Sequence, residues 1–276
     1  MKSFLVSHAQ RWLTGIIAVP LLLLLILKGS ALLFSCFVVF VVFLAALEYE
    51  KLVAPNWMTG RRWEFILMAP LIPCLVYFCD LHYAFFFLPP FIMILLLADL
   101  LRQTSRQGDP EMASVAKIVF GLIYIPLFMS YFISVYAMDH GPFWILFIVV
   151  LAFSGDTAAF YTGKTWGKNK LLPAISPNKT SEGFIGLIIG SMIGCGIYGY
   201  FFLPHVSLFH ILSMAFLGSI IGQLGDLFES VIKREAGQKD SGRLLPGHGG
   251  ILDRIDCLLF IAPFIYYYHQ LLDMAF

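Results

Sequence analysis

Long apolar stretches alternate with short polar connections along almost the whole chain. A helix needs about 20 mostly apolar residues to cross the hydrocarbon core of a bilayer, and nine stretches meet this requirement. They lie near residues 12–28, 31–48, 63–79, 83–101, 116–137, 142–162, 183–203, 208–229 and 251–272. The pattern predicts an all-α, polytopic integral membrane protein with about nine transmembrane helices.

The composition supports this prediction. Of the 276 residues, 59% are hydrophobic and only 13% are charged, whereas soluble domains carry roughly a quarter charged residues. The formal net charge is +1, so the chain lacks the excess of cations that nucleic-acid binding requires. We therefore expect the lipid bilayer, and no nucleic acid, among its partners.

Basic residues are distributed unevenly between the two sides of the predicted membrane. If the N-terminus is cytoplasmic, 17 of the 18 Lys and Arg residues face the cytoplasm and only Lys28 faces outward. Cytoplasmic segments are enriched in basic residues, so we expect the N-terminus inside and the C-terminus outside. The compact chain shows no soluble N-terminal extension or transit peptide, which suggests the cytoplasmic (inner) membrane of a bacterium.

The polar segments divide the chain into two predicted regions. Residues 1–115 hold about four spans with little candidate chemistry, and residues 116–276 hold about five spans with the polar clusters described below. The longest connections, 162–182 and 230–250, are both expected in the cytoplasm. We therefore expect a cytoplasm-facing active site in the C-terminal region.

Charge is concentrated between Asp226 and Asp256, where 11 of 31 residues are charged. Asp226, Glu229 and Lys233 are spaced i, i+3 and i+7, so they share one helix face. Asp226 lies within an apolar run, where an ionised carboxylate is costly unless a cation compensates it. This predicts a functional site; an ion pair with Lys233 or Arg234 is the structural alternative.

A second acidic pair, Asp253 and Asp256, begins the last predicted span, directly after the glycine-rich residues 247–250. Glycines let the backbone approach a ligand, and the N–H groups of a helix N-terminus attract phosphate. Facing Asp226 across a helix hairpin, these acids would form an oxygen cluster of the kind that holds Mg²⁺ with phosphate oxygens. A nucleoside triphosphate fits this charge balance, and a solvated cytoplasmic hairpin is the alternative.

A third polar cluster lies in the sixth predicted span and the connection after it. Asp156 lies inside an apolar span and, like Asp226, needs a partner. Residues 176–182 resemble the capped start of the next helix, with hydroxyl groups and Lys179 directed toward the same cytoplasmic layer. This segment alone is weak evidence of a site, and it gains weight because it lies on the same side as the charged hairpin.

These residues resemble the phosphatidate cytidylyltransferase (CDP-diacylglycerol synthase) family. The segment from Ser230 to Asp256 matches the pattern Ser-x-Ile-Lys-Arg-x4-Lys-Asp-x-Gly-x2-Leu-Pro-x-His-Gly-Gly-Ile-x-Asp-Arg-Ile-Asp. Segments 156–161, 176–180 and 222–230 also look like that family, so the resemblance covers roughly residues 120–272. The chain departs from the expected pattern at Ser181, where we expect Trp.

The resemblance implies that CTP and phosphatidic acid are converted to CDP-diacylglycerol and pyrophosphate, with Mg²⁺ required. It also implies a homodimer and a metal site at Asp226, Asp253 and Asp256; a monovalent cation such as K⁺ beside Mg²⁺ is left open. The motifs and the resemblance together assign catalysis to Asp226, Lys239, Asp240, His248, Asp253 and Asp256. They assign substrate binding to Asp156, Ser176, Lys179, Thr180, Glu182, Glu229, Lys233, Arg234, Gly249, Gly250 and Arg254.

Other functions stay open at this point. A related CTP-dependent enzyme could act on another lipid phosphate, or a polyprenol-type kinase could transfer a phosphoryl group. A transporter or channel could use Asp156 and Asp226 to coordinate an ion, although the acids gather toward one membrane face rather than the midplane. An inactive lipid-binding scaffold is the third alternative.

Overall fold

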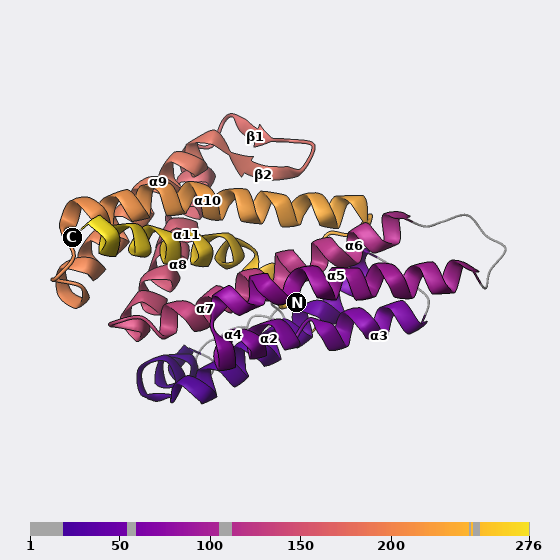
Figure 1. Ribbon diagram of the computed structural model, residues 1–276. Coiled ribbons are helices and arrows are strands. Elements are labelled where there is room, and N and C mark those ends of the chain that lie inside the picture. Colours follow the sequence, from indigo (N-terminus) through magenta and orange to yellow (C-terminus); the bar gives the residue numbers. More distant parts are fainter. Residues whose placement is uncertain (1–18, 54–58, 105–111, 243, 245–248, 276) are drawn as a thin grey trace. The chain divides into compact units, whose positions relative to one another are not determined.

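The computed structural model describes residues 19–53, 59–104, 112–242, 244 and 249–275, most of which are helical (Figure 1). The chain divides into two compact units, one formed by residues 30–134 and the other by residues 1–29 and 135–276. The division predicted from the sequence, between residues 1–115 and 116–276, concerns function rather than these compact units, and it stays a prediction.

Eight helical segments in the described part of the chain are long and apolar enough to cross a membrane. They correspond to the last eight predicted spans and confirm a polytopic helical membrane protein. Their bounds are Ala31–Val53, Arg62–Cys79, Leu81–Ala98, Val115–Tyr136, Gly141–Trp166, Ser181–Phe202, Leu208–Glu235 and Leu252–Leu272. Of the first predicted span, a helix over Val19–Lys28 is described, and residues 12–18 lie outside the described residues.

The unit of residues 30–134 contains the early helices. They are α2 (Ala31–Val53), α3 (Thr59–Met68), α4 (Leu71–Cys79), α5 (Leu81–Thr104), α6 (Met112–Leu122), the π-helix η1 (Ile123–Leu127) and the start of α7 (Phe128–Tyr136). Proline explains two irregularities, because it has no N–H to donate and clashes with the preceding turn. Pro70 separates α3 from α4, and Pro126 lies in η1, where its carbonyl accepts a hydrogen bond from the Ser130 hydroxyl at 2.6 Å.

The second unit contains the later helices and a β-hairpin. Helices α8 (Gly141–Trp166), α9 (Ser181–Phe202), α10 (Leu208–Glu235) and α11 (Leu252–Ala275) pack together, and the hairpin of β1 (Lys170–Leu172) and β2 (Ser176–Thr180) lies between α8 and α9 in the chain (Figure 1). The hairpin was not predicted. The capped helix start was predicted, and Thr180 provides it by accepting a hydrogen bond from the Gly183 N–H at 3.1 Å.

Helices α8 and α9 approach closely because α9 presents glycine to α8 at every fourth residue. A Cβ atom at Gly186 would lie 2.0 Å from Thr162 Oγ1, and one at Gly190 would lie 2.3 Å from the Cβ of Ala158. Small residues at this spacing let membrane helices pack backbone against backbone. The contact fixes the position of α8, which carries Asp156.

Candidate active site

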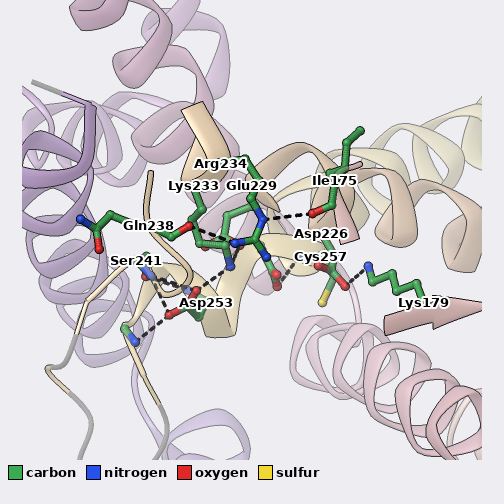
Figure 2. Close-up of polar contacts among 12 residues, drawn as sticks. Ile175, Lys179, Asp226, Glu229, Lys233, Arg234, Gln238, Ser241, Asp253 and Cys257 are labelled. Atoms are coloured by element: carbon green, nitrogen blue, oxygen red, sulfur yellow. Dashed lines mark hydrogen bonds and ion pairs between the residues drawn. The ribbon is translucent and has the colours of Figure 1, made fainter. Parts of the chain in front are cut away.

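Three charged side chains join the end of α10 to the start of α11. The Lys233 ammonium group forms ion pairs with Glu229, one turn earlier in α10, and with Asp253 Oδ1 of α11 at 2.7 Å (Figure 2). The Glu229 side chain is fully buried, and those of Lys233 and Asp253 are only 13% and 9% exposed. Charges so deeply buried are stable only when they are paired and hydrogen-bonded. We call Glu229, Lys233 and Asp253 the charged triad.

The carboxylate of Asp253 also organises the segments on both sides of it. It accepts hydrogen bonds from the N–H of Ser241, at 3.0 and 3.2 Å, and from the N–H of Gly250 at 2.8 Å. The Ser241 hydroxyl in turn accepts from the N–H of Asp253 at 3.3 Å. Gly249 has φ of +81°, and a Cβ there would lie 2.9 Å from Asp253 Oδ2. Position 249 therefore requires glycine both for its backbone conformation and for this close approach.

The β-hairpin brings a second lysine to α10. Lys179 of β2 donates a hydrogen bond to Asp226 Oδ2 (Figure 2). Arg234 connects the hairpin to the end of α10, because its Nε donates a hydrogen bond to the Ile175 carbonyl at 3.2 Å. Its Nη1 donates to the Gln238 carbonyl, just after α10, at 3.3 Å. The described ion pair of Asp226 is thus made with Lys179, whereas the structural alternative considered above was a pair with Lys233 or Arg234.

Three aspartates from three helices lie within electrostatic range of one another, and two of them, Asp156 and Asp226, also interact with Lys179. Asp156 of α8, Asp226 of α10 and Asp256 of α11 interact electrostatically with one another. Gly225 makes part of this approach feasible, because a Cβ there would lie 2.7 Å from the carbonyl oxygen of Asp256. Asp156 and Asp226 both line a pocket between the four helices. We call Asp156, Asp226 and Asp256 the acid group.

The acid group fits a divalent cation that is bound partly by substrate. Its donors are all carboxylate oxygens, which Mg²⁺ prefers, and Mg²⁺ usually binds one or two carboxylates together with substrate phosphates rather than a complete protein cage. Within the described ranges, no set of three or more His, Cys, Asp or Glu side chains is arranged as a metal-ligand shell. Asp253, by contrast, already accepts hydrogen bonds on both oxygens from Lys233, Ser241 and Gly250.

Several other predicted site residues lie at the edges of this arrangement. Glu182 accepts hydrogen bonds from the N–H of Lys168 at 3.1 Å and from the Asn169 side chain at 2.9 Å, so it braces the segment before the hairpin. Ser176 begins β2 and is paired with Leu172 of β1.

The remaining predicted residues are on or next to the segment between α10 and α11. Lys239 and Asp240 are exposed in that segment, and Arg254 is exposed in the first turn of α11. Gly250 is buried. His248 lies outside the described residues, so its predicted catalytic role stays a prediction.

Sequence reasoning missed two residues near the site. Ser241 bonds reciprocally with Asp253 across 12 positions, and no local spacing rule connects residues so far apart. Gln223 lines the same pocket as Asp226, three residues earlier on α10. Its position within an apolar span was a usable signal, because buried polar residues in membrane helices are often functional.

The fold and the site together define a class: a polytopic membrane protein in which an acid group and paired lysines can bind a cation together with phosphate groups. The sequence over residues 9–272 matches the model of the cytidylyltransferase family. The chain therefore belongs to the cytidylyltransferase family.

Individual relatives agree with this assignment, two of the following three over nearly their whole length. A phosphatidate cytidylyltransferase of Bacillus subtilis (strain 168) is 34% identical over 279 residues, which cover 95% of this chain and 98% of the relative. One from Staphylococcus aureus (strain COL) is 32% identical over 266 residues, covering 92% and 96%. One from Staphylococcus haemolyticus (strain JCSC1435) is 42% identical over 147 residues, covering 53% and 56%.

Proposed function

We propose that this protein is a phosphatidate cytidylyltransferase, which transfers CMP from CTP to phosphatidic acid and forms CDP-diacylglycerol and pyrophosphate. The observation that carries the proposal is the acid group beside Lys179 and the charged triad, in a chain related over nearly its full length to proteins of that name. Acids alone would repel both substrates, because both carry phosphate. Acids combined with lysines and a cation can hold two phosphate groups next to each other.

The reaction needs charge neutralisation and alignment more than proton transfer. An oxygen of the phosphatidic acid phosphate attacks the α-phosphorus of CTP, and the bond from that phosphorus to the oxygen bridging to the β-phosphate breaks. The attacking phosphate is already anionic near neutral pH, so no strong general base is needed. Catalysis then depends on holding the attacking and leaving oxygens in line and on stabilising the charge that develops on pyrophosphate.

Each charged group has a role in this proposal. Asp226 and Asp256 hold the divalent cation, with Asp156 adjacent. Asp253, the third metal ligand that the sequence predicts, instead holds Lys233 and the segment before α11 through its hydrogen bonds. The cation, when bound, neutralises phosphate charge and activates the leaving group. Lys179 and Lys233, which are paired with carboxylates in this structure, provide ammonium groups for phosphate oxygens. Lys239, Asp240, His248 and Arg254 are assigned to catalysis or substrate binding by the resemblance.

The proposed orientation places the site at the cytoplasmic face of a bacterial cytoplasmic membrane. The uneven distribution of basic residues supports it, because 17 of 18 would then face the cytoplasm. In this position a soluble nucleotide and a lipid headgroup can meet without either crossing the bilayer. A homodimer and a K⁺ ion beside Mg²⁺ are further expectations, tested by the mass of the detergent-solubilised protein and by exchange of the monovalent salt.

The proposal is tested by turnover of purified, detergent-solubilised protein with CTP, phosphatidic acid and Mg²⁺, omitting each component in turn. We expect a cytidine liponucleotide and pyrophosphate only when all three are present. Release of CDP instead of pyrophosphate would identify a kinase, and activity only with another lipid phosphate would identify a related cytidylyltransferase. Either result would overturn the proposal.

The assignment of Asp226 is tested by the substitution Asp226→Asn, which keeps the size of the side chain and removes its charge. We expect turnover to fall by at least about 100-fold, because one preorganised charge at such a site contributes on the order of 3 kcal/mol, while the unfolding midpoint changes little. Asp139→Asn, in the exposed turn before α8, is the matched control and should keep full activity. Near-normal turnover in Asp226→Asn would remove this residue from the proposed cation site.

A further inference from the structure

The pocket that contains Asp156 and Asp226 is lined by residues of α8, α9, α10 and α11. The two acids are only part of its lining. The remaining lining residues are mostly small or apolar, and the polar ones among them are Ser191, Ser219 and Gln223. The pocket therefore combines a charged part with a part that suits a less polar group.

Gln223 is the residue in this lining whose hydrogen-bonding needs are not met. It is only 8% exposed, and its amide nitrogen is buried without a hydrogen-bond partner among the described residues. The other buried polar groups in the lining differ. The Ser191 hydroxyl donates to the Leu151 carbonyl at 2.9 Å, and the Ser219 hydroxyl donates to the Phe216 carbonyl at 2.8 Å. Buried donors are rarely left unpaired, so the Gln223 amide is suited to an acceptor that arrives with a ligand.

The chemistry of the amide group narrows the choice of ligand. Its nitrogen carries two donor N–H groups and no acceptor, so it bonds to an oxygen acceptor rather than to a cation. Both substrates of the proposed reaction offer phosphate oxygens, which form strong charge-assisted hydrogen bonds with such donors. The negative charges of the phosphate and the acid group repel each other, and a cation bound between them offsets this repulsion.

The position of Gln223 along α10 indicates which of the two substrates it contacts. On α10, the basic residues Lys233 and Arg234 follow Asp226 toward the segment that connects to α11. Gln223 precedes Asp226 by three residues, which is about one helical turn or 4.5 Å further into the apolar bundle. A nucleotide reaches the site from water, whereas a lipid phosphate reaches it attached to acyl chains that stay in the bilayer.

We propose that the Gln223 side-chain amide donates a hydrogen bond to the phosphate of phosphatidic acid and holds this acceptor substrate beside the acid group. This inference rests on the proposed function. It assigns Gln223 to lipid recognition rather than to nucleotide recognition.

Two substitutions test the role of this amide. Gln223→Met keeps the length of the side chain and removes its polar group, and Gln223→Glu keeps its shape but replaces the donor by a carboxylate. Kinetics in mixed micelles should show KM for phosphatidic acid raised roughly 10- to 100-fold in Gln223→Met, the loss expected for one hydrogen bond to a charged group. We expect KM for CTP to change less than about threefold, and Gln223→Glu to be more impaired because its charge repels phosphate.

Binding without turnover provides an independent readout. A ligand that binds only the folded protein raises its unfolding midpoint, so short-chain phosphatidic acid with Mg²⁺ and no CTP should stabilise the wild type and stabilise Gln223→Met much less. Ser130→Ala is the matched control, because it removes a buried hydroxyl outside this pocket, and the proton of that hydroxyl is already bonded to the Pro126 carbonyl. It should keep the wild-type KM values and the wild-type response.

The outcomes distinguish this inference from the proposed function. An active wild type together with an unchanged KM for phosphatidic acid in both Gln223 variants would overturn the inference alone. An equal rise of both KM values with a lowered unfolding midpoint would identify a structural role and also overturn it. Activity of Gln223→Glu at or above the wild-type level would show that position 223 binds a cation. A wild type that does not use phosphatidic acid would overturn the proposed function, and this inference with it.

Discussion

Removal of the Lys233 charge should destabilise the protein strongly, because two buried carboxylates share this one ammonium group. The substitution Lys233→Met keeps an unbranched chain but removes the cation. It leaves Glu229 with 0% and Asp253 with 9% of the side chain exposed, without their shared partner. Removing one partner of a buried ion pair typically costs about 3–5 kcal/mol, since the remaining charge cannot be hydrated. This is a large part of the stability of an ordinary domain.

Thermal unfolding in detergent, followed by tryptophan fluorescence, measures this effect. For a chain of this length, about 3–5 kcal/mol corresponds to a lowering of the midpoint by roughly 6–20 °C. The matched control is Lys168→Met, at an exposed position after α8, where we expect a change within about 0.5 kcal/mol. The double variant Lys233→Met with Glu229→Gln also removes the unpaired charge of Glu229, and it should be more stable than Lys233→Met alone.

Two results would refute this reasoning. A loss of stability below about 1 kcal/mol in Lys233→Met would mean that the two carboxylates are hydrated or protonated without cost. A double variant no more stable than the single variant would mean that Glu229 is not coupled to Lys233, because residues that interact directly show non-additive effects of about 0.5–3 kcal/mol.

Two further predictions concern helix packing and a group far from the site. Gly190→Ala should lower the unfolding midpoint, because the new Cβ would lie 2.3 Å from the Cβ of Ala158. Gly196→Ala on the same helix is the control: its Cβ meets only an ordinary contact at 3.5 Å, so this variant should be neutral or stabilising. Equal midpoints in the two variants would contradict the packing of α8 on α9. Burial and the neighbouring imidazoles of His140 and His269 lower the pKa of His205 from its usual 6.5. The folded state then binds this proton less readily than the unfolded state, so the contribution of His205 to stability is present above pH 6.5 and is lost as the pH falls. An NMR titration midpoint of His205 at or above 6.5 would show this to be wrong.

The membrane helices could be predicted from the sequence because the signal is local. Each span is a continuous apolar stretch of about the required length, and the eight that fall on described helices differ from the observed bounds by at most six residues. The hairpin of β1 and β2 could not be predicted in the same way. Its strands are three and five residues long, too short for an alternating pattern to be distinguished from a loop.

The candidate site was predicted as a set of residues but not as a set of contacts. The spacing i, i+4 of Glu229 and Lys233 fits their ion pair. The pair of Lys179 with Asp226 spans 47 positions, and it depends on a hairpin that the sequence did not reveal. The sequence could place both residues in one layer of the membrane, but a pairing over that distance is decided by tertiary packing.

The glycines on α9 show a signal that was present and not used. Gly186, Gly190 and Gly194 are spaced four residues apart, a spacing typical of closely packed membrane helices. Their close contacts with α8 position Asp156 relative to α10 and α11. This pattern would have predicted that α9 packs closely against another helix along this face.

The most direct test of the central claim is to follow the phosphorus atoms of CTP. In two parallel reactions with phosphatidic acid and Mg²⁺, purified protein receives CTP labelled either at the α-phosphate or at the γ-phosphate. Transfer of CMP predicts that the α-label moves into the lipid and the γ-label leaves as pyrophosphate. The γ-label in the lipid and the α-label in CDP would show phosphoryl transfer instead, and this would contradict the account.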